Sequence, residues 1–183
     1  QMPGDWGPIG KKKMVLRKIL TDEANGRVLE AMCGFNSYIK PDSKFKEVVA
    51  LDFSEVALKK YKFPVRKRIL YNLENIASDG KINFFDASCF DTVSIAFGVN
   101  YLTKPVKVFR EFYRIISENG KLLIVGGNKQ GYQDLEKHGR FNPDKFNGFV
   151  KKAGFDSRII KLDDLKKENE MGNYYLIKGI KKI

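Results

Sequence analysis

The sequence has few residues that could bind a metal or cross-link the chain. Its 183 residues include two cysteines, Cys33 and Cys89, and one histidine, His138. A structural zinc site needs four nitrogen or sulfur ligands, so the sequence predicts no bound metal. An uncharged apolar run of about 18 residues, as a membrane helix requires, is absent, and the first residues do not look like a secretory leader. We therefore expect a cytoplasmic protein that neither spans a membrane nor depends on a disulfide.

Acidic residues are scarce relative to basic ones. The chain has 22 Asp and Glu against 34 Lys and Arg, a formal charge of +12. Such an excess fits a nucleic acid partner, an anionic substrate or a solvated surface. Most of the cations are lysine, whereas nucleic-acid readers use arginine for bidentate contacts, so we favour the solvated surface over a nucleic acid. The densest basic cluster is a candidate anion-binding face or a solvated helix face and comprises Lys59, Lys60, Lys62, Arg66, Lys67 and Arg68.

Apolar runs alternate with segments of helical spacing along the chain. With 43% hydrophobic residues and 13% aromatics, it can fold as one domain with its own core. Strands are expected at residues 27–30, 47–52, 82–85, 91–97, 121–125, 157–162 and 174–180, and helices at 11–20, 54–64, 66–76, 106–116 and 142–154. The last two strands are too close in sequence for a helical crossover and should be antiparallel. The pattern predicts a doubly wound, Rossmann-like α/β fold with a seven-stranded sheet, in which an N-terminal helical segment, residues 1–25, precedes the core, residues 26–183.

Three acidic residues, Glu30, Asp52 and Asp86, fall at or next to the expected ends of strands. In an open α/β sheet, ligands bind beyond the carboxyl ends of the strands, where the strand order reverses. Asp52 follows Glu30 by about 20 residues and ends the second strand, where a carboxylate can accept hydrogen bonds from both ribose hydroxyls. The three acids therefore predict a nucleoside-containing cofactor, although a single strand-end acid could equally cap the next helix.

Four motifs occur in order along the core. They are VLEAMCG at residues 28–34, VVALDFS at 48–54, FDTV at 90–93 with FGVNYLTKP at 97–105, and FREFYRII at 109–116 with NGKLLI at 119–124. Together they resemble the class I S-adenosylmethionine-dependent methyltransferases of the type 11 group. The resemblance covers residues 27–126, and the expected terminal hairpin extends it, since that family closes its sheet with a reversed last strand. It implies S-adenosylmethionine as the cofactor and in-line displacement on its sulfonium methyl as the reaction.

The loop after the first strand departs from the pattern of that family. The family's loop carries three alternating glycines, whereas Met32 and Asn36 replace the first and third here and only Gly34 remains. Asparagine tolerates the left-handed backbone region that glycine permits, but methionine does not. Pro41 also lies where the family's first helix normally runs, so the turn before it must be short. The loop looks more like that of a variant branch, which shares the Tyr-Leu-Thr-Lys-Pro stretch.

The resemblance implies a role for each matching residue. Glu30 and the loop residues Met32, Cys33, Gly34 and Asn36 would hold the methionine end of the cofactor, Asp52 its ribose, Phe53 the adenine face, Asp86 and Ala87 the adenine edge, and Phe97 and Gly98 the methionine moiety from below. Cys33 is expected to act there as a small apolar residue and not as a nucleophile.

Candidates for catalysis on the acceptor side are fewer. Asn100 and Tyr101 follow the fourth strand, and His138 lies where some relatives place a general base. Asn100 is equally well explained as a turn residue, and a lone histidine in a polar loop is more often simply exposed. Trp6 and Tyr132 could be lid aromatics over the pocket or could only pack.

Three functions remain compatible with these residues. The first is a methyltransferase acting on a small-molecule acceptor. The second has RNA or a protein as acceptor, because of the charge, and the third is a non-catalytic module that binds S-adenosylmethionine, because of the missing glycines. A nicotinamide dehydrogenase is less well supported, since the third glycine of its fingerprint is missing. We favour the first, with the acceptor recognised by residues 1–25 and 128–140, whose cations suit an anionic molecule, in a monomer or a homodimer.

Overall fold

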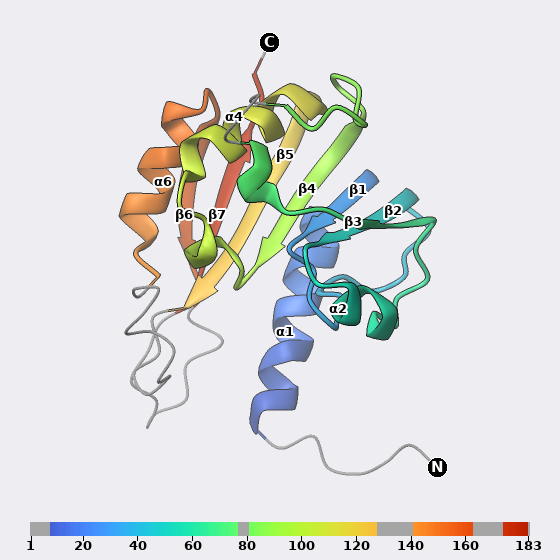
Figure 1. The fold of residues 1–183 in the computed structure, drawn as a ribbon. Coiled ribbons are helices and arrows are strands. Elements are labelled where there is room, and N and C mark those ends of the chain that lie inside the picture. The colour runs from blue at the N-terminus through green and yellow to red at the C-terminus, as the bar shows by residue number, and fades with distance from the viewer. Residues whose placement is uncertain (1–7, 77–80, 128–140, 163–173, 183) are drawn as a thin grey trace, which may run out of the picture.

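Seven strands form one mixed sheet in the order β3-β2-β1-β4-β5-β7-β6 (Figure 1). The computed structural model describes residues 8–76, 81–127, 141–162 and 174–182. The strands are β1 (Gly26–Ala31), β2 (Phe45–Asp52), β3 (Lys67–Leu70), β4 (Phe90–Ala96), β5 (Ile116–Gly127), β6 (Asp156–Lys161) and β7 (Tyr174–Ile180). The first five are parallel, and β7 is antiparallel to β5 and to β6. The order reverses between β1 and β4, so a ligand crevice is expected beyond the carboxyl ends of these strands.

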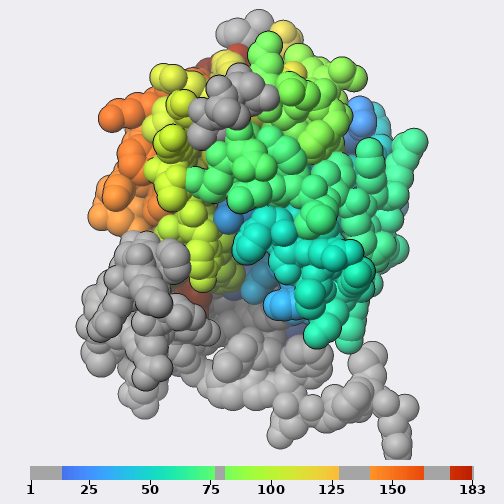
Figure 2. All heavy atoms as spheres, viewed as in Figure 1, coloured from blue at the N-terminus to red at the C-terminus, as the bar shows by residue number. Residues whose placement is uncertain are grey.

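Helices cover both faces of the sheet. On one face, α1 (Pro8–Glu23) and α2 (Glu55–Lys60) bury Leu16, Leu20 and Leu58. On the other face lie α4 (Pro105–Ile115), α6 (Pro143–Lys152) and the short 3-10 turns η1 (Leu73–Asn75) and η2 (Val99–Tyr101). Figure 2 shows side chains of α4 and of the segment that follows β3 covering this second face. Within the described ranges, no helix is long and apolar enough to cross a bilayer.

The predicted fold class and most of the predicted elements are confirmed. Ser54 caps α2 by accepting a hydrogen bond from the amide of Ala57, and Asn142 caps α6 through the amide of Lys145. The two terminal strands, β6 and β7, are antiparallel as expected. Because these signals are local, they could be recognised without knowledge of the tertiary structure.

Two predicted elements between α2 and β4 are wrong. Residues 66–76 contain β3 and η1 instead of a helix, and residues 82–85 form a turn instead of a strand. In β3, which reads Lys-Arg-Ile-Leu, only Ile69 is buried, because this strand lies at the edge of the sheet. It therefore lacks the apolar run that marks a central parallel strand. Ile82 is fully buried in the core without being part of a strand, which explains the misleading pattern at 82–85.

A buried ion pair holds the turn at residues 82–85 in place. The side chain of Glu111, on α4, is 1% exposed and pairs with Arg114 at 2.6 Å. Glu111 also accepts the backbone N–H of Ile82 at 2.7 Å, and Arg114 donates to the carbonyl of Phe85 at 2.7 Å. The Glu-x-x-Arg pattern of the fourth motif thus ties α4 to the segment that leads into β4.

The connection from β1 to β2, residues 32–44, contains no helix. The sequence predicted only that the turn at residues 37–40, before Pro41, would be short. Ile39 is fully buried instead, and Arg17 of α1 donates to its carbonyl at 3.3 Å. The hydroxyl of Thr21 accepts the amide of Lys40 at 2.8 Å. A helix that precedes β1 therefore covers the surface that a crossover helix usually covers.

Candidate functional site

A mostly apolar cavity of about 200 Å³ lies at the carboxyl ends of the central strands. Its walls come from the loop after β1, the end of β2, the segment after β3 and the turn after β4. The lining residues are Met32, Leu51, Phe53, Tyr71, Asn72, Leu73, Glu74, Tyr101 and Leu102. Typical ligand pockets have roughly 300–1,000 Å³, so the cavity fits a nucleobase-sized group rather than a whole dinucleotide.

Asp52 ends β2 beside this cavity and is buried. One of its carboxylate oxygens accepts the amide of Gly34 at 2.9 Å, and the other accepts the amide of Ser54 at 2.9 Å. A carboxylate offers about four lone-pair sites, so two backbone donors leave acceptor capacity on both oxygens. Gly34 has φ +58°, and nothing lies within 4 Å of where its side chain would be. The loop backbone thus faces open space next to Asp52, as a ligand cradle requires.

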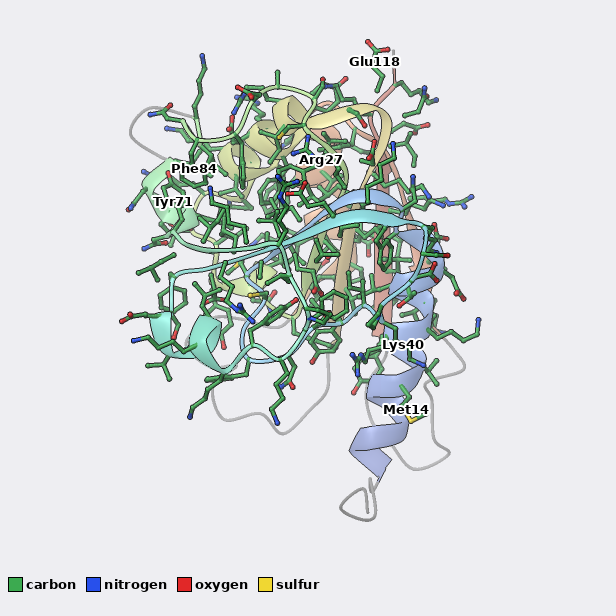
Figure 3. All side chains as sticks on the ribbon, turned by 90° about the vertical axis from the view of Figure 1, so that its right-hand side faces the viewer. Met14, Arg27, Lys40, Tyr71, Phe84 and Glu118 are labelled. Atoms are coloured by element: carbon green, nitrogen blue, oxygen red, sulfur yellow. The ribbon has the colours of Figure 1, made fainter. Side chains whose placement is uncertain are left out.

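Phe53 and the residues after β3 form the apolar part of the cavity. The Phe53 side chain is 67% exposed although it lines the cavity, so one face of its ring is open. Leu70, at the end of β3, pairs with Asp52, which places Tyr71 and Asn72 at the same edge. Figure 3 shows Tyr71 beside Phe84, and their rings are 5.2 Å apart in an edge-to-face arrangement.

The far wall of the cavity is joined to the turn after β4. Glu74 accepts hydrogen bonds from the backbone N–H of Thr103, at 2.9 Å, and from its hydroxyl. Thr103 belongs to the Tyr-Leu-Thr-Lys-Pro stretch, which thereby acquires a structural role. Tyr71, Asn72 and Leu73 were not expected to line the cavity, because the sequence did not indicate β3. A strand predicted at residues 67–70 would have located them.

Asp86 and Ala87 are not part of this arrangement, which corrects the prediction for both. They are exposed and follow a turn instead of a strand. β4 begins at Phe90, and the neighbouring Ser88 donates to the carbonyl of Arg114 at the end of α4. This position is the amino edge of the parallel sheet, opposite the cavity. Asn72, two residues after the end of β3, lines the cavity instead.

Glu30, predicted to hold the methionine end of a cofactor, is engaged within the protein. It is 4% exposed, and its carboxylate accepts hydrogen bonds from the Ser37 hydroxyl at 2.6 Å, the Tyr38 amide at 3.0 Å and the Tyr61 hydroxyl. Burial raises the pKa of Glu30, and the three hydrogen bonds oppose part of that rise. Burial, together with the nearby Asp52 and Glu30 carboxylates, also raises the pKa of the Cys33 thiol, which agrees with the expectation of a small apolar residue at this position.

Met32 adopts the backbone conformation that was expected to need glycine. Its φ is +53°, whereas Asn36 is not among the residues with positive φ. The left-handed region costs a non-glycine residue roughly 1–2 kcal/mol, so the loop stores strain at Met32. Met32 packs closely against Gly98, where an added Cβ would lie 2.8 Å from the Met32 Cβ. Gly98 has no side chain and therefore leaves room for the side chain of Met32.

Replacing Gly98 by alanine tests this contact. We expect Gly98→Ala to lower the free energy of unfolding by about 1–3 kcal/mol, because the new methyl group overlaps the Met32 side chain. In a Met32→Gly background the same substitution should be nearly neutral, since the obstructing Cβ is gone. Urea denaturation of the four proteins measures both effects, and equal costs in the two backgrounds would contradict the proposed contact.

The remaining predicted residues that the structure describes, Phe97, Asn100 and Tyr101, lie in the turn after β4. Phe97 has φ +60°, and its ring lies 5.6 Å from that of Tyr38 and 6.2 Å from that of Tyr174. Asn100 is partly buried within η2, and the exposed Tyr101 lines the cavity. The predictions for His138, Trp6 and Tyr132 fall outside the described residues. Phe97 and Met32, on facing loops, both have a positive φ, and backbone strain of this kind is common at functional sites.

The basic cluster at residues 59–68 lies on the surface, on α2 and the edge strand β3. Lys59 pairs with Glu55 at 2.8 Å, and Arg66 pairs with Glu47 at 3.2 Å. Arg68 donates to the carbonyl of Tyr61 at 3.0 Å. Charged residues on an exposed edge strand also oppose edge-to-edge aggregation, which is a sufficient explanation for this cluster.

Comparison with known proteins agrees with this geometry. Residues 12–138 match the ubiE/COQ5 methyltransferase family. The demethylmenaquinone methyltransferase of Listeria welshimeri is 30% identical over 115 residues, which are 59% of this chain and 48% of that protein. The chain thus spans about half the length of the curated relatives it matches.

Solved structures share the fold. The phosphoethanolamine N-methyltransferase 2 of Haemonchus contortus, determined with S-adenosyl-L-methionine, has a TM-score of 0.66 at 14% identity and covers 99% of this chain and 54% of that one. An S-adenosylmethionine-dependent methyltransferase of Mesorhizobium loti has a TM-score of 0.67 at 13% identity, with 95% and 100% covered. The resemblance found in the motifs is confirmed. Since the family match extends over more than half of its residues, this chain belongs to the ubiE/COQ5 methyltransferase family.

Proposed function

We propose that this chain binds S-adenosylmethionine at the carboxyl edge of its sheet and transfers the methyl group to a small-molecule acceptor. The observation that carries the proposal is the cavity between Phe53 and Asn72 with the Asp52 carboxylate at its edge. This arrangement offers a flat apolar surface for a base and an acceptor for ribose hydroxyls, which are the two halves of an adenosine. Membership of the family agrees with it.

The residues present fit the nucleoside half of the cofactor. Asp52 would accept the ribose hydroxyls with its remaining lone pairs, and Phe53 would stack on the base. The Asn72 side chain accepts the amide of Glu74 and keeps its amide donors for the edge of the base. The open space beside Gly34 would receive the part of the cofactor that leads from the ribose toward the methionine end. Glu30 does not fit as a ligand, because it is only 4% exposed, does not line the cavity and already accepts three hydrogen bonds from within the protein.

When bound, the cofactor would supply an electrophilic methyl group on a sulfonium. The contribution of the chain is then mainly to hold two reactants at reactive distance, which can account for most of the acceleration of such a transfer. Tyr101, which lines the cavity, and Asn100, in the same turn, are the described residues proposed for the acceptor side. His138 stays a prediction.

The acceptor proposed first is a quinone precursor, because the Listeria relative is named for methylating demethylmenaquinone. An anionic small molecule, a monomer or homodimer and a cytoplasmic location all remain predictions from the sequence. Methyl transfer from labelled S-adenosylmethionine should therefore be assayed with reduced demethylmenaquinone and, in parallel, with bulk RNA and protein. Transfer to RNA with steeply salt-dependent binding would favour the alternative acceptor. Tight cofactor binding without transfer to any acceptor would favour the non-catalytic module.

Calorimetric titration with S-adenosylhomocysteine tests cofactor binding directly. Phe53→Ala should weaken the affinity by about tenfold, because stacking of a base on an aromatic ring contributes about 1–3 kcal/mol. Stability should hardly change, since the ring is largely exposed. Met14→Ala, which removes a similarly exposed apolar side chain on α1, is the control and should bind like the parent protein (Figure 3). No binding by the parent protein at millimolar ligand would rule out the proposed function.

A further inference from the structure

Three buried side chains meet behind the candidate cofactor site. Glu30 is the last residue but one of β1, Ser37 lies in the connection that lacks a helix, and Tyr61 follows α2. All three are nearly inaccessible to solvent, and both hydroxyls donate to the Glu30 carboxylate. The Tyr38 amide completes the set of donors. Residues separated by 31 positions in the sequence are thus joined in one buried network.

The network provides hydrogen-bond partners for backbone groups that a helix would pair in an ordinary crossover. The Cys33 amide still bonds the carbonyl of Leu51 on β2 at 3.2 Å, but without a helix after β1 the amides of residues 34–39 lack the partners that helical backbone would give them. The Tyr38 amide uses Glu30 instead, and the Ile39 amide uses the Ser37 hydroxyl at 3.0 Å. A buried carboxylate with several donors is therefore a structural requirement of this connection and explains why an acid is needed at position 30.

The same network is connected to the cavity through a closed path. Glu30 accepts a hydrogen bond from Ser37, which lies three residues after Gly34 in the same loop. The Gly34 amide in turn donates to Asp52 at 2.9 Å. Asp52 also accepts the amide of Ser54, which caps α2, and α2 leads to Tyr61 and so back to Glu30. Glu30, Ser37 and Tyr61, which do not line the cavity, thereby fix the distance between Gly34 and Asp52.

We propose that Glu30, Ser37 and Tyr61 are positioning residues, which hold the Gly34 backbone and the Asp52 carboxylate in place for the nucleoside, and that Glu30 does not itself contact the methionine end of the cofactor. This inference rests on the proposed function. It differs from the role expected for Glu30 from the sequence, where the acid was a direct ligand. The physical reason is burial: Glu30 is 4% exposed and does not line the cavity, and its carboxylate accepts the Tyr38 amide on one oxygen and both hydroxyls on the other.

Two ligands separate positioning from direct contact. S-adenosylhomocysteine carries the amino acid, whereas 5′-methylthioadenosine has the same nucleoside and thioether without it. Loss of a hydrogen bond to a buried charged group should loosen the loop, so Tyr61→Phe and Glu30→Gln should each weaken binding of both ligands, by about tenfold and by the same factor. Tyr113→Phe is the matched control, since that hydroxyl makes a solvent-exposed hydrogen bond to the carbonyl of Lys182 at 3.4 Å, far from this network. It should bind both ligands like the parent protein.

Other outcomes would overturn the inference. If Glu30→Gln weakens binding of S-adenosylhomocysteine but leaves 5′-methylthioadenosine unchanged, Glu30 is a direct ligand of the amino acid. If Tyr61→Phe and Ser37→Ala leave both affinities unchanged, the network does not position the site. A Glu30→Gln and Tyr61→Phe double variant should bind no more weakly than the worse single variant, because both changes break the same network.

Failure of the proposed function gives a different result. The parent protein would then bind neither ligand, and the network is judged by thermal unfolding of the single and double variants. A double variant that melts at the same temperature as the worse single variant supports the network. Additive losses of melting temperature would show that Glu30 and Tyr61 act independently and would end the proposal.

Discussion

Glu111→Ala should lower the free energy of unfolding by about 3 kcal/mol, a large effect for a polar side chain. The substitution leaves the Arg114 guanidinium without its carboxylate and the Ile82 amide without its acceptor in the interior. Breaking one side of a buried ion pair typically costs about 3–5 kcal/mol, and the partial exposure of Arg114 places the value at the lower end. Urea denaturation followed by circular dichroism measures the change.

The pair formed by Lys59 and Glu55 supplies the control. Both side chains are largely exposed, and the pair is spaced i, i+4 on α2. Glu55→Gln should leave the free energy of unfolding nearly unchanged, because an exposed ion pair is screened by water and salt. If Glu111→Ala cost as little as this control, the ion pair would not be what holds residues 82–85 against α4.

Asp52→Ala should weaken binding of S-adenosylhomocysteine at least about 100-fold, the largest functional effect expected. Hydrogen bonds to a charged group contribute about 1.5–3 kcal/mol each, and the ribose offers two hydroxyls to this carboxylate. The substitution also releases the amides of Gly34 and Ser54, so the loop next to the cavity loses its anchor. Calorimetric titration gives the affinity, and thermal unfolding shows whether the variant remains folded.

Asp86→Ala is the control for Asp52, because sequence reasoning gave both acids a place at the cofactor. Asp86 is exposed at the amino edge of the sheet, so its removal should leave the affinity unchanged. Equal losses for the two variants would mean that the nucleoside site has been placed at the wrong edge. Asn72→Ala, by contrast, should weaken binding several-fold, since Asn72 lies at the end of β3 and lines the cavity.

The fold class could be predicted because its signals are local. The apolar runs of β2 and β4 and the capping residues Ser54 and Asn142 each mark an element without reference to the rest of the chain. The position of Asp52 followed from the same reasoning, since it directly ends a recognisable buried strand. The edge strand β3 gave no such signal, because only one of its four residues is buried.

The sequence by itself determined the doubly wound sheet, the reversed terminal strand and the presence of Asp52 and Phe53 at a carboxyl edge, because these depend on patterns within a few residues. Only the tertiary structure decided that Asp86 lies away from the cavity and that Asn72 lines it. It alone showed that no helix follows β1 and that Glu30 is bonded to Tyr61. The reason is that these features depend on contacts between segments far apart in the chain, and the partner that satisfies a buried carboxylate is set by packing and not by spacing.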